Sequence, residues 1–428
     1  MPTSGKQKGT LPLLPTEILW KILSDACLEV ADFLHLSCVN KRLSQVVRQK
    51  LYEEIVLNSD QPMAVEQLLT SLSANTHLLR LIHHLKLRSL PGRKWVAIPE
   101  RINLALKQIL RLRLPALESL AWEMSKIDIN VYELDPMLPV RSVHVNRASV
   151  EQSVALMLLP NIQCIHIDHI SDTVQQCVPS YHVGKGSKFS TAKNIRIDGG
   201  FTPHIALSPF MNWPWELQFF HGSVTIDDNL SPTSFDRYLE PARDTLIDLS
   251  VVVHTDEFTS VDGTFIYFDT FKCLKHLNST ASLLFGSSWA SPTAERAGLY
   301  RRLPTTLESL TVFFDNLSKA VGTGREEVYT GTETPPDYVW IMELTNLPNF
   351  KYLRIKESLL SGYHSPNFES FQWVPHHIIL DCFGRNSIEF EASLRSYKQY
   401  AVAVAARMTR IRTRREAARA LTRTATTQ

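Results

Sequence analysis

Cysteine and histidine residues gather between positions 164 and 182, and these side chains are the ones best suited to bind a metal. The group consists of Cys164, His166, His169, Cys177 and His182. Its spacings match no standard tetrahedral zinc pattern. His166 also alternates with Ile165 and Ile167, which places it on the opposite, solvent-facing side of a strand. We therefore predict that this chain holds no metal.

A basic glycine segment, Val183–Lys188 with the sequence VGKGSK, is the next candidate for chemistry. A phosphate-binding loop has the form Gly-x-x-x-x-Gly-Lys-Ser/Thr, and the first glycine is missing here. The sequence contains no Gly-x-Ser-x-Gly motif and no local set of serine, histidine and aspartate. We expect no catalytic residue and no cofactor, with catalytic groups that lie far apart in the sequence left open.

The residues that organise the chain lie instead in its N-terminal part, from Leu11 to Leu57. Pro15 suits the first turn of a helix, where no backbone N–H is needed. One apolar face follows at helical spacing, formed by Ile18, Leu19, Ile22, Leu23 and Ala26. Asp32 and Asn40 are predicted to cap a second and a third helix. Three amphipathic helices this short leave apolar surface uncovered, which indicates a partner.

The same stretch resembles an F-box. The matching residues are Leu14-Pro15-x-Glu17-Ile18, then Ile22-Leu23, then Leu34-x-Leu36-x-x-Val39-Asn40-Lys41-Arg42-Leu43. Two positions depart from the family pattern: Asn40 replaces the usual Cys or Ser, and Leu43 the usual Trp. The resemblance implies docking on the Skp adaptor of a cullin-based (SCF) ubiquitin ligase, through Leu14, Pro15, Glu17, Ile18, Ile22, Leu23, Leu36, Val39, Asn40 and Leu43. The alternative is an ordinary helical subdomain that packs on its own chain.

Composition and length set the wider frame. With 428 residues, 44% hydrophobic and 21% charged, the chain is typical of a folded protein with one small and one large domain or a repeat array. Six scattered cysteines and a polar N-terminus predict free thiols in a reducing compartment, hence a cytoplasmic or nuclear protein. No apolar run reaches membrane-spanning length, so we expect no membrane span.

A degenerate repeat, apolar-x-x-apolar-x-apolar, follows the helical stretch. Its copies are Ile82–Leu87, Leu117–Trp122, Val140–Val145, Ile162–Ile167, Ala192–Ile197, Leu246–Val251, Leu274–Leu277, Leu307–Val312 and Phe350–Ile355, with an ambiguous copy at Leu217–Phe220. The second half of each copy alternates like a short strand with one buried face. Residues 54–57 read as a first strand, and residues 61–79, 98–112 and 150–159 read as helices. The pattern resembles a leucine-rich repeat, although most copies lack the Asn that should follow the strand and their spacing is irregular.

The fold class predicted is therefore α/β, in four parts. A disordered leader (1–10) precedes the F-box (11–57), and an irregular, leucine-rich-repeat-like α/β solenoid (58–390) follows, with the aromatic-rich segment 361–390 capping its end. A basic C-terminal helix and tail (391–428) completes the chain, with the helix running from Glu391 to Thr422.

The tail holds most of the net charge. Residues 392–428 carry a net charge of +8, which leaves −6 for residues 1–391 out of the overall +2. Three explanations stay open for the arginines: a solvated helix, a nuclear localisation or nucleic-acid patch, or contact with an acidic membrane or partner. The absence of aromatic residues among the arginines argues against nucleic acid as a partner, and against specific single-strand binding in particular.

Together the two resemblances imply a non-catalytic substrate-receptor subunit of an SCF ubiquitin ligase, of a type similar to F-box proteins with loose leucine-rich repeats that are abundant in filamentous fungi. Its partners would be the Skp adaptor, a cullin reached through that adaptor, and a protein substrate of unknown identity bound by the repeats. Two alternatives remain: a non-ligase interaction scaffold, and an enzyme built in the loop-rich face.

Overall fold

The computed structural model describes residues 14–25, 28–58, 61–88, 100–123, 138–170, 188–199, 210–226, 232–255, 266–285, 296–314, 338–357, 370–372 and 377–395. The chain divides into two compact units. The N-terminal unit comprises Met1–Arg147 with Leu158–Gln163, and the C-terminal unit comprises Ala148–Met157 with Cys164–Gln428. None of the helices in these described stretches is long and apolar enough to cross a membrane.

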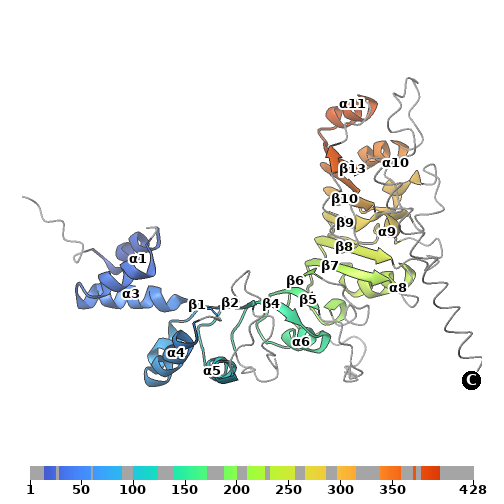
Figure 1. Cartoon of the computed structure of the whole chain (residues 1–428). Coiled ribbons are helices and arrows are strands. Elements are labelled where there is room, and N and C mark those ends of the chain that lie inside the picture. The colour runs from blue at the N-terminus through green and yellow to red at the C-terminus, as the bar shows by residue number, and fades with distance from the viewer. Residues whose placement is uncertain are drawn as a thin grey trace, which may run out of the picture. The chain divides into compact units, whose positions relative to one another are not determined.

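The N-terminal unit opens with three helices, which we call the head: α1 (Thr16–Asp25), α2 (Val30–Ser37) and α3 (Lys41–Glu53) (Figure 1). The predicted N-cap of the third helix is confirmed, because the Asn40 side chain accepts a 2.8 Å hydrogen bond from the Leu43 backbone N–H. A cap of this kind satisfies one of the amides that a helix start leaves without a partner.

The predicted cap of the second helix is wrong. The N-cap of α2 is Glu29, and Asp32 is the third residue of the helix. The Asp32 carboxylate reaches back to accept a 3.0 Å hydrogen bond from the Glu29 backbone N–H. An acidic side chain satisfies free amides equally well from this third position, as one half of a capping box, so residue type alone did not distinguish the two sites.

The rest of the N-terminal unit alternates strands with helices. Its elements are β1 (Glu54–Asn58), α4 (Pro62–Ala74), η2 (Thr76–Arg80), β2 (His84–Arg88), α5 (Glu100–Arg111), β3 (Ser119–Glu123) and β4 (Ser142–Ala148). The four strands pair in chain order, and each pair is parallel. The first strand and the helices predicted at 61–79 and 98–112 are confirmed by β1, α4 and α5.

The C-terminal unit continues the alternation. Its helices are α6 (Val150–Leu156), α8 (Pro232–Leu239), η4 (Glu240–Ala242), α9 (Ala281–Phe285), η6 (Leu299–Arg302), α10 (Val339–Glu343), η8 (Leu344–Asn346) and α11 (His377–Arg385). Its strands are β5 (Cys164–Ile170), β6 (Asn194–Gly199), β7 (Phe219–Ile226), β8 (Asp248–Thr255), β9 (His276–Thr280), β10 (Ser309–Phe314), β11 (Tyr352–Glu357), β12 (Ser370–Gln372) and β13 (Glu389–Arg395). Strands β5 to β11 pair in chain order and in parallel, β13 adds to β11, and β12 closes the edge as an antiparallel strand.

Every copy of the sequence repeat leads into one of these strands, and the ambiguous copy Leu217–Phe220 leads into β7. The backbone carbonyl of the residue before a strand helps to fix the register with the next strand, because it accepts hydrogen bonds from the amides at the start of that strand. The Lys275 carbonyl, for example, accepts hydrogen bonds of 2.7 and 2.9 Å from the N–H groups of Glu308 and Ser309. The predicted strands and α/β class are thus confirmed as a mostly parallel sheet with helices, and the leucine-rich-repeat solenoid stays a prediction.

The predicted start of the C-terminal helix is wrong. Residues from Glu391 to Arg395 belong to β13, in which Ala392 is buried while Glu389 is exposed. Pairing with β11 satisfies the backbone of this segment and overrides a helix propensity that is worth only tenths of a kcal/mol per residue, about 0–0.7. Residues 396–428, which include most of the basic tail, lie outside the described residues.

Candidate protein-docking site

The head folds around a small apolar core of its own. Leu23, Val46 and Val47 form the buried centre, and the partly buried side chains packed against it are Trp20, Leu28, Phe33, Leu36 and Leu51. These residues recur every three or four positions along each helix, so each helix turns one face inward. Because three short helices enclose little volume, the remaining apolar side chains have no place inside.

Five large apolar side chains of the head face solvent. Their exposed fractions are 45% for Ile18, 42% for Ile22, 65% for Val30, 54% for Leu34 and 63% for Val39. Scattered exposed apolar residues are normal on a folded protein, whereas five within one small helical domain are typical of an interaction surface. We call these five residues the apolar face of the head.

Polar contacts fix the helices that carry this face. The Arg42 guanidinium donates a 3.3 Å hydrogen bond to the Thr16 hydroxyl, which ties the first turn of α3 to the first turn of α1. The Lys50 ammonium lies 5.2 Å from the centre of the Trp20 ring and pairs with Glu53 at 2.7 Å. These contacts couple α1 to α3, so that Ile18 and Ile22 are held on a fixed support.

The residues predicted to dock the adaptor occupy three kinds of position. Pro15, Glu17, Ile18, Ile22 and Val39 are exposed. Leu14, Leu36 and Asn40 are half-buried, and Asn40 caps α3. Leu23 and Leu43 are buried in the interior of the head, where they support the face from beneath. The docking role of the whole set stays a prediction.

Val30 and Leu34 belong to the apolar face but were not among the predicted docking residues. They lie four positions apart in α2, so both project from the same side of that helix. Phe33 and Leu36 point the other way, onto the core. The sequence shows this four-residue spacing, which places Val30 and Leu34 on one side of α2. It does not show which side of the helix faces the core.

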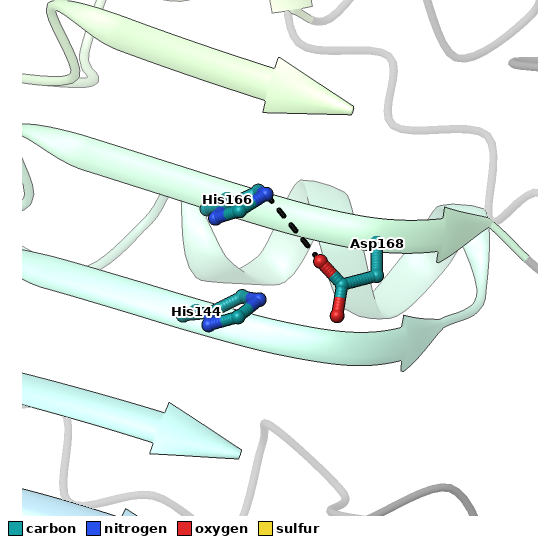
Figure 2. Close-up of side chains that lie close together, drawn as sticks. All are labelled: His144, His166 and Asp168. Carbon is teal, nitrogen blue, oxygen red and sulfur yellow. Dashed lines mark ion pairs between the residues drawn. The ribbon is translucent and has the colours of Figure 1, made fainter. Parts of the chain in front are cut away.

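The metal-binding candidates of the sequence are engaged otherwise. His166 Nε2 lies 2.6 Å from an Asp198 carboxylate oxygen and 3.4 Å from one of Asp168, the pair drawn with a dashed line in Figure 2. His166 projects to the opposite side from the buried Ile165 and Ile167, as predicted. His144, labelled in the same figure, lies on β4 of the N-terminal unit.

The remaining cysteines and histidines of the 164–182 group give little support for a metal site. Burial raises the pKa of the Cys164 thiol, which disfavours the thiolate that a metal would need. Cys177 and His182 lie outside the described residues, as does most of the glycine segment 183–188. The absence of a metal stays a prediction.

Two histidine–serine pairs bridge neighbouring strands, and the sequence did not reveal them. His84 Nδ1 lies 2.8 Å from Ser119 Oγ, and His276 Nδ1 lies 2.8 Å from Ser309 Oγ. Both pairs occupy the first position of adjacent parallel strands, so they are equivalent links in the sheet. A histidine–serine pair can also serve as the base and nucleophile of an acyl-transfer enzyme. That reaction would require hydrogen-bond donors aimed at an oxyanion, and the backbone amides of these strands are already used in strand pairing. The pairs are therefore best explained as cross-strand links.

A comparison with protein families identifies the head. Residues 11–58 match the F-box-like family model. The match spans all three helices and β1, and therefore includes every residue of the apolar face. No curated protein matches the chain.

Proposed function

We propose that this chain is the substrate-recognition subunit of an SCF-type ubiquitin ligase, which docks the Skp adaptor through the head and a protein substrate through the strand-rich remainder. The F-box-like match supports an adaptor-binding role for the head. Such a subunit acts by proximity, because it holds a substrate lysine near the conjugating enzyme, and carries no catalytic group of its own. We expect the protein to work in the cytoplasm or the nucleus.

The single observation that carries the proposal is the exposure of the apolar face. Ile18, Ile22 and Val39 would be unable to reach a partner if the head buried them against its own chain. They are exposed instead, while their neighbours Leu19, Leu23 and Leu43 form the interior. Contact with an adaptor would remove this apolar surface from water, at about 25 cal/mol per Å².

The substrate side rests on the parallel strands, which supply a broad and regular surface. A parallel sheet built from successive copies of one motif presents a new row of side chains with each strand, and this is the kind of surface that repeat proteins use for binding. The leucine-rich-repeat character and the fungal type are parts of this same proposal.

Capture of purified Skp adaptor by the full chain tests the proposal. Ile18→Asp and Ile22→Asp are expected to weaken capture by at least about tenfold, because each places an unpaired charge in an apolar contact. Met63→Asp is the control, since Met63 is also an exposed apolar residue but lies on α4, outside the F-box-like match. Unchanged capture by both head variants, or no capture by the wild type, would overturn the docking role.

Co-capture of a cullin distinguishes a ubiquitin-ligase subunit from a non-ligase scaffold. If the captured adaptor brings a cullin with it, and substrate ubiquitylation depends on Ile18 and Ile22, the receptor function stands. If the adaptor binds without a cullin, the chain is a non-ligase scaffold and the proposed function is rejected.

A further inference from the structure

On the polar, solvent-facing side of strands β5 to β13, the partly buried carboxylates of Asp198 and Glu391 each have several partners. Asp198 accepts a 2.6 Å hydrogen bond from Arg196 Nε and contacts His166, and these partners hold the pKa of Asp198 below its usual range against the effect of burial. Glu391, on β13, accepts hydrogen bonds from Tyr352 at 2.8 Å and from Arg354 at 2.7 Å. A half-buried carboxylate normally requires such partners.

Asp248, the first residue of β8, lacks such partners. Its carboxylate is half-buried, yet within the described stretches of the chain no side chain donates a hydrogen bond to it or forms an ion pair with it. The titratable groups whose charges act on it are His276, which is directly opposite on β9, and His221 on β7. Burial lowers the pKa of His221, and Nδ1 of His276 is engaged by the Ser309 hydroxyl.

Loss of water around Asp248 is therefore only partly compensated. Burial raises the pKa of its carboxyl above the ordinary value, and this effect outweighs the opposing attraction of His276 and His221. A cationic group placed against it would recover this lost stabilisation, and an anionic ligand would be repelled.

An aromatic ring borders the same carboxylate. Phe219, the first residue of β7, is directly opposite Asp248 in the parallel register, and its side chain is 37% exposed (Figure 1 shows the two strands side by side). Leu249 and Phe220, the next residues along, are buried, so Asp248 and Phe219 project together to the solvent-facing side. A carboxylate beside a partly exposed aromatic ring suits a planar cation, which can pair with the acid and stack on the ring.

We propose that Asp248 and Phe219 form a subsite for an arginine side chain carried by a segment of the protein substrate. This inference rests on the proposed receptor function, since it names the chemistry of the substrate that the C-terminal unit recognises. Arginine fits better than lysine, because its planar guanidinium forms the ion pair and the stacking contact at once, whereas an ammonium does so only as a point charge.

The test probes an array of ten-residue peptides with the full chain, once alone and once with the Skp adaptor added. Each peptide carries one central arginine between uncharged flanks, and its partner on the array carries citrulline, which keeps the shape and loses the charge. The wild type is expected to retain the best arginine peptides about tenfold better than their citrulline partners, the value for one charge-assisted hydrogen bond. Asp248→Asn should reduce that ratio to about one, and Phe219→Ala should lower it about threefold.

Asp244→Asn is the matched control, because Asp244 is an exposed aspartate that precedes β8 and is already paired with Lys272 at 2.8 Å. It should leave the arginine preference unchanged. An equal response to arginine and citrulline in the wild type, or an intact preference in Asp248→Asn, would overturn the subsite.

Thermal stability gives a second, independent readout. Removing a half-buried charge that lacks hydrogen-bond and ion-pair partners should leave the melting temperature of Asp248→Asn equal to that of the wild type or higher. A clear drop would mean that Asp248 has a structural partner, and would overturn the proposal. Adaptor capture is measured on the same samples: its failure in the wild type would reject the ligase function while the arginine preference still reported on the subsite.

Discussion

Ile22 and Leu23 are consecutive residues of α1, yet the side chain of Leu23 is buried in the core of the head while that of Ile22 is 42% exposed. One of the two stabilises the fold and the other is available to a partner. This division allows the stability and the binding of the head to be changed separately.

Leu23→Ala is expected to lower the free energy of unfolding by about 2–4 kcal/mol, since it removes a buried side chain and leaves a cavity. Ile22→Ala should change it by less than about 1 kcal/mol, because little burial is lost. Urea titration of the head, followed by circular dichroism and Trp20 fluorescence, measures both. Equal losses in the two variants would contradict the assignment of inner and outer sides.

Asn40→Ala is expected to cost about 1 kcal/mol of stability, because the first turn of α3 loses the side chain that accepts from the Leu43 amide. Asn40→Asp is the control: aspartate caps a helix equally well, so its urea midpoint should match that of the wild type. If alanine were as stable as aspartate at this position, the cap would have no energetic role.

Val30 and Leu34 provide a prediction that the sequence motif did not make. Replacing both by serine should weaken adaptor binding by about tenfold or more, as measured by isothermal titration, because two exposed apolar contacts are lost. The melting temperature should be retained, since neither side chain lies in the core. Unchanged affinity would remove α2 from the docking surface.

Glu308 makes part of the stability depend on pH. It lies 2.6 Å from Lys351 and 3.1 Å from Lys275, and these hydrogen-bonded lysines lower its pKa from 4.5 to about 2. A carboxyl whose pKa is lower in the folded state stabilises the protein above the unfolded-state value, and loses this effect as the pH falls towards the folded-state value. The melting temperature of the wild type should therefore be higher than that of Glu308→Gln at pH 6. The difference between the two melting temperatures should disappear as the pH falls from 4.5 to about 2.

The dependence on ionic strength distinguishes an effect of the Glu308 charge from an effect of side-chain packing. The ion pairs of Glu308 are accessible to solvent, so high ionic strength should reduce the difference at pH 6. A difference that stays constant across both pH and salt would show that the glutamine disturbs packing and that the carboxylate charge has no part in it.

Local patterns determined much of this protein without the tertiary structure. Helical spacing in residues 16–53 and the alternation in each repeat copy depend only on neighbouring residues, and both led to the correct elements. The cap at Asn40 was predicted for the same reason, since a capping side chain acts within its own turn. The F-box motif was likewise readable, because its residues are consecutive along three short helices.

The tertiary structure alone decided which side of each element is covered. Ile18 and Leu19 are both large and apolar, and only packing in the folded chain makes one outer and the other inner. Pairing with β11 turned Glu391–Arg395 into a strand where local propensity favoured a helix. Asp248 and Phe219 are 29 positions apart in the sequence and become neighbours through parallel pairing of β7 with β8. Long-range register has no local signal, because it is set by which apolar faces are buried together.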